Sequence, residues 1–145
     1  MKWNNDRSLL LSRVCVWGFT VALAALFLTA PWFWNWVLWR ANVRIVYIAV
    51  TYASGIPAAV VVWCLHQLLR NISEEEVFIQ ENVRSLRIMS WCLIAAALVY
   101  LVGSAFDWYL IVFAVAAAFV GLILRVVKNV FAQAVELKNE NDFTI

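Results

Sequence analysis

Few side chains in this 145-residue sequence are of the kinds that perform catalysis or bind metals. His66 is the one histidine, and no Asp, Glu or Cys stands three or four residues from it, where a helical metal site needs a second ligand. Cys15, Cys64 and Cys92 lie singly in apolar runs without a CxxC pair, where cysteine behaves as a small hydrophobic residue. Asp107 separates two apolar runs, where we expect it to be hydrated and to cap the following helix.

Sequence motifs of the common enzyme classes are also missing. The chain contains no GxSxG, HExxH, P-loop or GxGxxG pattern. No acidic residue falls within a predicted membrane span, as a proton-coupled antiporter would require. We therefore expect a non-enzymatic protein without cofactor or metal. We interpret His66 as an interfacial residue with a local hydrogen bond, and a pH switch is the alternative.

The composition indicates a membrane protein. Hydrophobic residues make up 66% of the chain and charged residues 14%, with a mean hydropathy of +0.84. Soluble domains average about 45–50% apolar and about 25% charged residues, and a small soluble fold cannot bury this excess. A soluble enzyme, a disordered chain and a disulfide scaffold are excluded. The net charge of +2 gives no basis for direct nucleic-acid binding.

Four uncharged runs approach or exceed the roughly 20 residues that cross the hydrocarbon layer. We expect Pro31 to end the first helix and to open a tryptophan-rich outer segment over 31–42. The first span is too long for a signal-peptide core, so we expect it to be retained. The predicted spans are about 9–30, 43–69, 89–105 and 108–128.

The basic residues predict the topology. Nine of the eleven Lys and Arg residues lie on one side of these spans, which the positive-inside rule assigns to the cytoplasm. Both termini are then cytoplasmic, and the chain is a multi-pass protein of the cell membrane. The nine residues are Lys2, Arg7, Arg13, Arg70, Arg84, Arg87, Arg125, Lys128 and Lys138.

We expect an all-α, integral membrane four-helix bundle in contact with membrane lipid, either single or as a homo-oligomer. Small residues permit close approach of membrane helices. The candidates are Gly18, Ala22, Ala25, Gly55, Ala58, Ala59, Ala95, Ala96, Ala116, Ala117 and Gly121. Gly55 and Pro57 lie in the middle of the second span, where proline removes a backbone donor and predicts a kink or hinge.

Four of the nine tryptophans fall within eight residues, at Trp32, Trp34, Trp36 and Trp39. On a helix, the first, third and fourth of them share one face. One interpretation is an aromatic belt at the outer membrane surface. The other is an outer pocket for a lipid, a peptide or a quaternary ammonium group.

Two patterned segments lie on the cytoplasmic side. Ser73–Glu76 has the spacing of a capping box and predicts a helix over 74–88 that leads into the third span. Helical spacing also continues past the fourth span, so we expect a cytoplasmic extension and tail over 129–145. Each of the two segments has apolar residues along one helical face. We expect this face to pack either against the other segment or against a partner.

These two segments resemble the DUF2975 family of small bacterial membrane proteins with four spans. Residues 76–88, EVFIQENVRSLRI, are similar to the family's PF-x-x-x-N-x-x-R-L-R-x-I-like segment. Residues 131–145, FAQAVELKNENDFTI, are similar to its ending F-x-x-A-x-x-L-K-x-E-N-D-L-T-I. Val77 replaces the usual proline and Phe143 the usual leucine. The resemblance is interpreted as covering essentially the whole chain.

The resemblance implies a partner, because genes of this family often adjoin one for a small helix-turn-helix regulator of the Cro/C1 type. We therefore predict a bacterial membrane regulator that binds or sequesters such a transcription factor. The candidate contacts are Glu81, Asn82, Arg84, Arg87, Phe131, Glu136 and Asp142. The alternative is a small transporter, immunity or lipid-interacting protein that acts through the helix bundle.

Overall fold

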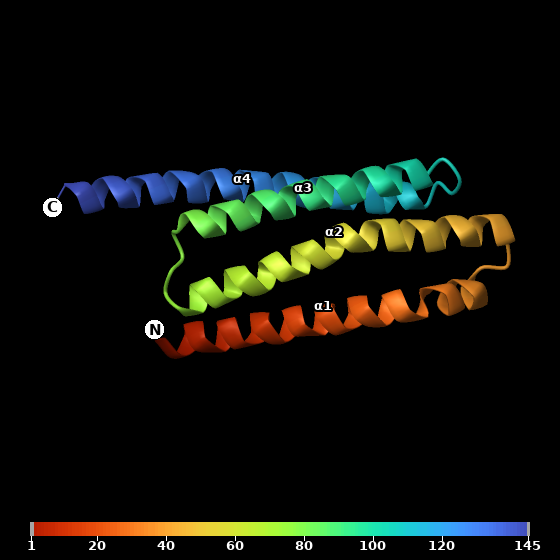
Figure 1. Ribbon diagram of the computed structural model, residues 1–145, viewed down its shortest axis with the longest axis horizontal. Coiled ribbons are helices and arrows are strands. Elements are labelled where there is room, and N and C mark those ends of the chain that lie inside the picture. The colour runs from red at the N-terminus through yellow and green to blue at the C-terminus, as the bar shows by residue number, and fades with distance from the viewer. Residues whose placement is uncertain (1, 145) are drawn as a thin grey trace.

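The computed structural model describes the backbone of residues 2–144 and the side chains of residues 7–144. The side chain of Lys2 and residue 145, both used above, lie outside this part. Within it the chain forms four helices and no strand, α1 (Lys2–Val37), α2 (Ala41–Ser73), α3 (Gln80–Gly103) and α4 (Leu110–Phe143) (Figure 1). All four are long and apolar enough to cross a membrane. The all-helical, four-span prediction is confirmed to that extent.

The helices differ in length relative to a bilayer. At 1.5 Å per residue, α1, α2 and α4 are each about 50 Å long and α3 about 36 Å, against roughly 30 Å of hydrocarbon. Figure 1 shows both termini at one end, where α4 projects past the other three helices. At the opposite end, the α1–α2 hairpin projects past the turn between α3 and α4.

The helices pack in sequence rather than as a closed bundle. α1 packs on α2, α2 on α3 and α3 on α4, and α1 meets neither α3 nor α4 among the described residues. This corrects the expected four-helix bundle, in which each helix has two neighbours. Lipid is as apolar as leucine, so there is no hydrophobic force that would close the row.

The tightest packing joins α2, α3 and α4. Cys64, Leu86 and Met89 are buried together and are covered by apolar residues of α2 and α4. Ser90 donates a hydrogen bond to the backbone carbonyl of Gly121 at 2.9 Å, which ties α3 to α4. Among the described side chains, no buried polar atom lacks a hydrogen-bond partner. Because Cys64 is buried in this apolar cluster, it packs as the small hydrophobic residue that the sequence predicted.

Gly55 and Gly121 lie in close contact with a neighbouring helix, whereas Gly18 faces open space. A methyl group on Gly121 would lie 3.3 Å from Leu93, and one on Gly55 would overlap the ring of Phe27 in α1. These glycines allow close helix approach, as predicted. Gly18 has nothing within 4 Å, so its predicted role in close packing is wrong.

The first predicted helix boundary is also wrong. α1 continues through Pro31 as far as Val37, so residues 31–37 are helical rather than a separate segment. Only Leu38, Trp39 and Arg40 connect α1 to α2. In a membrane, a helix that stopped at Pro31 would leave backbone groups unsatisfied, whereas continuing it loses a single donor.

The predicted capping box is not formed. Ser73 is the last residue of α2, and its hydroxyl donates to the carbonyl of Arg70 at 2.7 Å. Residues 74–79 are a turn in which Glu75 has a φ of 62°, and α3 begins only at Gln80. The α2 helix therefore uses the serine that was expected to start the next one. The expected continuity into the third span is confirmed, as is the long helical extension of the fourth.

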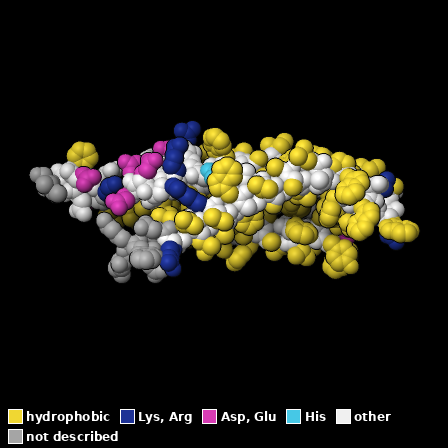
Figure 2. Space-filling model, turned by 90° about the horizontal axis from the view of Figure 1, so that it is seen from below, with side chains coloured by type: hydrophobic (Ala, Val, Ile, Leu, Met, Phe, Trp, Pro, Cys, Tyr) yellow, Lys and Arg dark blue, Asp and Glu magenta, His cyan; other side chains and the backbone are white. Residues whose placement is uncertain are grey.

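Charged side chains gather at the end that holds both termini, and the middle of the molecule is covered by hydrophobic side chains (Figure 2). Lys and Arg also appear at the opposite tip. The histidine, drawn in cyan, lies at the border between the charged end and the apolar middle. This distribution is that of a protein whose middle contacts lipid.

Candidate functional site

The exposed start of α3 and the projecting end of α4 form the surface on which we expected a partner to bind. Glu81, Arg84 and Arg87 are exposed on α3, and Glu136 and Asp142 are exposed on α4. A surface pocket of about 480 Å³ joins the two helices at this point. It is lined by Gln80, Ala132, Val135, Glu136, Asn139, Glu140 and Phe143. We call the exposed residues and this pocket the α3–α4 end surface.

Two of the predicted contacts lie elsewhere. Asn82 is 0% exposed, so it does not belong to the surface. Phe131 is half-buried, 5.6 Å from the ring of Phe78, and packs against the buried cluster around Met89. Asn82 therefore packs inside the fold, whereas Phe131 packs partly inside it and keeps part of its side chain exposed.

Asn82 holds the turn between α2 and α3. Its amide donates to the backbone carbonyls of Glu76 at 3.0 Å and Val77 at 2.8 Å. Its own carbonyl accepts a hydrogen bond of 2.8 Å from the amide of Asn71, which is also buried. The paired asparagines replace the helix cap that the sequence predicted, and they fix the turn beside the α3–α4 end surface.

The tryptophan cluster divides between two faces. Trp32, Trp36 and Trp39 are 75%, 80% and 98% exposed, whereas Trp34 is half-buried. The exposure of the first three is that expected of a belt that contacts lipid headgroups. The predicted common helical face holds only for Trp32 and Trp36, because α1 ends at Val37 and Trp39 lies in the connection to α2. Trp34 instead donates a hydrogen bond of 3.0 Å to the hydroxyl of Thr51 in α2.

A chain of polar contacts starts at Trp34 and crosses this end of the molecule. Thr51 donates to the carbonyl of Tyr47 at 2.7 Å, and the Tyr47 hydroxyl donates to Asp107 at 3.0 Å. Asp107 also accepts the backbone N–H of Tyr109 at 3.3 Å, one residue before α4 begins. Asp107 therefore stabilises the turn between α3 and α4, close to the capping role expected of it.

The predicted hinge residues, Gly55 and Pro57, lie near the middle of α2, and Figure 1 shows α2 changing direction partway along its length. α2 is continuous through Pro57, and Gly55 is buried against Phe27. Gly55 therefore has a packing role in addition to any hinge role. Both residues line a cavity of about 650 Å³ to which all four helices contribute, including Leu26 of α1 and Phe113 of α4.

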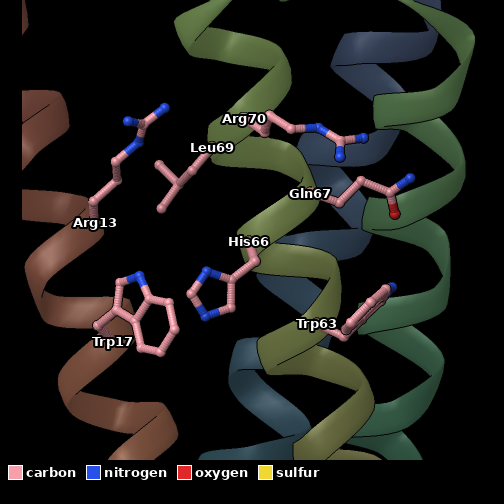
Figure 3. A pocket seen from close by; sticks show the side chains of 7 residues that line it. All are labelled: Arg13, Trp17, Trp63, His66, Gln67, Leu69 and Arg70. Atoms are coloured by element: carbon pink, nitrogen blue, oxygen red, sulfur yellow. The ribbon is translucent and has the colours of Figure 1, made fainter.

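A second group of residues, which the sequence analysis did not assemble, lies between α1 and α2 at the charged border. A cavity of about 390 Å³ is lined there by Arg13, Trp17, Trp63, His66, Gln67, Leu69 and Arg70 (Figure 3). We call this the α1–α2 pocket. The α2 side of this pocket could have been predicted from the sequence, because residues 63, 66, 67 and 70 share one helical face.

His66 has the local hydrogen bond that the sequence predicted. Its Nε2 lies 3.0 Å from the hydroxyl of Thr20 in α1, and its ring contacts Trp17 edge-on at 5.3 Å. Arg13 of α1 donates to the hydroxyl of Ser73 in α2 at 2.7 Å. Among the described residues, no group of three His, Cys, Asp or Glu side chains is arranged to hold a metal ion.

The fold defines a class, that of small proteins with four helices long and apolar enough to span a membrane. The family model described as "Protein of unknown function (DUF2975)" matches residues 38–145. The chain therefore belongs to the DUF2975 family. The match includes all of α2, α3 and α4 and leaves α1 outside, so it is narrower than the whole-chain resemblance expected from the sequence. No curated protein and no solved structure matches the chain.

Proposed function

We propose that this chain is a non-enzymatic regulator of a bacterial cell membrane that binds a small helix-turn-helix DNA-binding protein at the α3–α4 end surface. In this arrangement both termini face the cytoplasm, as the Lys and Arg distribution predicts. The family's gene neighbourhood suggests the partner. The α3–α4 end surface provides a place for it.

The observation that carries the proposal is the projecting end of α4. Glu136, Lys138 and Asp142 place this segment outside the hydrocarbon layer, because charges within it are costly. Leu137 and Phe143 are nevertheless 64% and 90% exposed on the same segment. Large apolar side chains that face water on an extended helix are typical of a binding surface.

The charge of the pocket suits such a partner. Glu136 and Glu140 both line it, beside Phe143. Helix-turn-helix proteins bind DNA with a basic, phosphate-contacting surface. An acidic pocket with an exposed aromatic residue can bind that same surface, and the bound regulator is then kept from DNA.

The test is affinity purification of the tagged full-length protein in mild detergent from its own host. We expect a stoichiometric small helix-turn-helix protein, which is lost when Glu136, Leu137 and Phe143 are replaced by alanine. The matched control replaces the exposed Trp32, Trp36 and Trp39 at the opposite end. Recovery of the partner with the first triple variant, or its loss with the control, contradicts the assignment of this surface.

A second candidate function uses the cavity between the four helices. Its volume of about 650 Å³ and its apolar lining suit a small hydrophobic molecule, as in a transporter or an immunity protein. The test compares two variants for their ability to restore the wild-type phenotype of a strain that lacks the protein. This second function is favoured if Ala96→Phe, which fills the cavity, fails to restore it while the alanine variant of Glu136, Leu137 and Phe143 succeeds.

A further inference from the structure

The α1–α2 pocket has cationic side chains on two sides. Figure 3 shows Arg13 directed from α1 toward α2, with Leu69 and His66 between the two helices, whereas Arg70 and Gln67 extend from α2 on the side away from α1. Arg13 uses one N–H on Ser73 and, like any guanidinium, carries five donors in all. Arg70 is exposed. Two arginines beside one pocket are suited to bind the oxygens of a phosphate group.

Hydrogen bonds fix the floor of the pocket. The hydroxyl of Thr20 donates its single hydrogen to the carbonyl of Val16 at 2.8 Å, so it accepts a hydrogen from Nε2 of His66. With this hydrogen on Nε2, the Nδ1 atom of His66 carries the lone pair, so it can accept a hydrogen bond from a hydroxyl group of a ligand but cannot donate one to a phosphate. The neighbouring acid, Glu81, is bonded by the amide of Gln67.

An apolar groove continues directly from the pocket. It has a volume of about 490 Å³ and shares Trp63 and His66 with the α1–α2 pocket. Its other lining residues are Thr20, Leu23, Ala24, Phe27, Leu28, Ala59 and Val62. Thr20 and Leu28 are eight residues apart on α1, so the groove is about 12 Å long at 1.5 Å per residue.

The depth of the site matches that of a lipid headgroup. Trp17 and Trp63 are 63% and 73% exposed beside the pocket, and tryptophan favours the boundary between headgroups and hydrocarbon. In Figure 2 the histidine lies at the border between the charged end and the apolar middle. The cationic pocket therefore faces the headgroup layer and the groove faces the hydrocarbon layer.

We propose that the α1–α2 site binds one anionic phospholipid of the leaflet nearest the termini. Its phosphate lies in the pocket that Arg13 and Arg70 line, and one acyl chain lies in the groove between Leu23 and Ala59. Basic pockets between membrane helices are suited to acidic headgroups, because the opposite charges attract. This binding site is separate from the α3–α4 end surface and does not depend on the function proposed there.

The test is native mass spectrometry of the delipidated full-length protein after addition of phosphatidylglycerol or phosphatidylcholine of equal chain length. We expect one phosphatidylglycerol to be retained and phosphatidylcholine to be lost. The double variant Arg13→Gln, Arg70→Gln should weaken phosphatidylglycerol binding about tenfold or more. The matched control, Arg40→Gln with Arg44→Gln, makes the same charge change at the opposite end and should leave binding unchanged.

Two further arms test the source of the phosphate and the role of the groove. Inorganic phosphate in excess should not displace the lipid, and Ala24→Phe should weaken lipid binding because its ring fills the groove. Circular dichroism checks that each variant keeps its helix content. The proposal is overturned if both lipids are retained equally, if the control weakens binding as much as the double variant, if inorganic phosphate displaces the lipid, or if Ala24→Phe has no effect.

Discussion

α1 and α3 are both long and apolar enough to span a membrane, yet they are held in very different ways. α3 has nine buried residues and contacts both α2 and α4. Val16 and Ala30 are the buried residues among the described side chains of α1, which packs on α2 alone. The difference coincides with the family match, which covers α2, α3 and α4 and excludes α1.

The comparison shows which kind of contact provides stability and which leaves room for ligands. The three helices α2, α3 and α4 are joined by apolar packing, and Gly121 lets α3 and α4 approach closely. α1 is joined to α2 by a few polar and aromatic contacts, such as Arg13 with Ser73 and Phe27 with Tyr52. The spaces between those contacts form the α1–α2 pocket and its groove.

The largest expected effect comes from emptying the core of α3. Met89→Ala should lower the free energy of unfolding by about 2–5 kcal/mol, because it opens a cavity in the buried cluster that Met89 forms with Cys64 and Leu86. Leu28→Ala in α1 removes a side chain that is 84% exposed and should change stability by less than about 0.5 kcal/mol. Denaturant titration in mixed micelles, followed by circular dichroism, measures both. Equal losses would remove the distinction between the two helices.

Next in size is the loss of the buried asparagine pair. Asn82→Ala should cost about 1–3 kcal/mol, since two backbone carbonyls and the amide of Asn71 lose their partner. The same titration applies. The control is Gln67→Ala, whose amide bonds Glu81 at an exposed position and should have a small effect. A neutral Asn82→Ala would show that the turn is held by other contacts.

A matched pair of glycines tests the α1–α2 contact itself. Gly55→Ala should destabilise the protein by about 1–3 kcal/mol, because its methyl group overlaps Phe27 and separates α1 from α2. Gly18→Ala meets nothing within 4 Å and should be neutral or stabilising by up to about 1 kcal/mol, from helix propensity. Protease sensitivity of α1, together with the unfolding titration, reports both changes. Identical behaviour of the two variants would contradict the packing described for Gly55.

The smallest effect is expected in the tryptophan cluster. Trp34→Phe removes the hydrogen bond to Thr51 and should cost about 0.5–1.5 kcal/mol. Trp36→Phe, at an 80% exposed position, should leave the unfolding free energy unchanged. The intrinsic fluorescence spectrum of the folded protein gives a second reading, because Trp34→Phe removes a half-buried indole and Trp36→Phe removes an exposed one. Equal destabilisation would mean that both indoles hold α1.

Hydrophobic run lengths predicted the four helices well, because a bilayer imposes a minimum apolar length that is readable from sequence. Local signals failed at the two places where tertiary structure competed with them. Pro31 did not stop α1, since the membrane penalises unsatisfied backbone more than it penalises a proline. Ser73 did not cap a new helix, since it bonds Arg13 and the Arg70 carbonyl as part of α2.

The candidate sites were only partly predictable for a related reason. The exposed charges of the α3–α4 end surface follow from helical periodicity, and the structure leaves them exposed. Asn82 was misassigned because a polar residue in a motif can serve either a partner or the fold, and only its burial distinguishes the two. The α1–α2 pocket was missed because its two arginines are 57 positions apart in the sequence and come together only when α1 packs on α2.

The proposed regulator function requires the charged end, with both termini, to face the cytoplasm, and cysteine accessibility tests this most directly. In a background where Cys15, Cys64 and Cys92 are replaced by alanine, Trp39→Cys and Asp142→Cys place single thiols at opposite, exposed ends. On intact cells, a membrane-impermeant maleimide should label Trp39→Cys, and Asp142→Cys should be labelled only after permeabilisation. The reverse pattern would place the α3–α4 end surface outside the cell, beyond the reach of any DNA-binding protein, and would contradict the account.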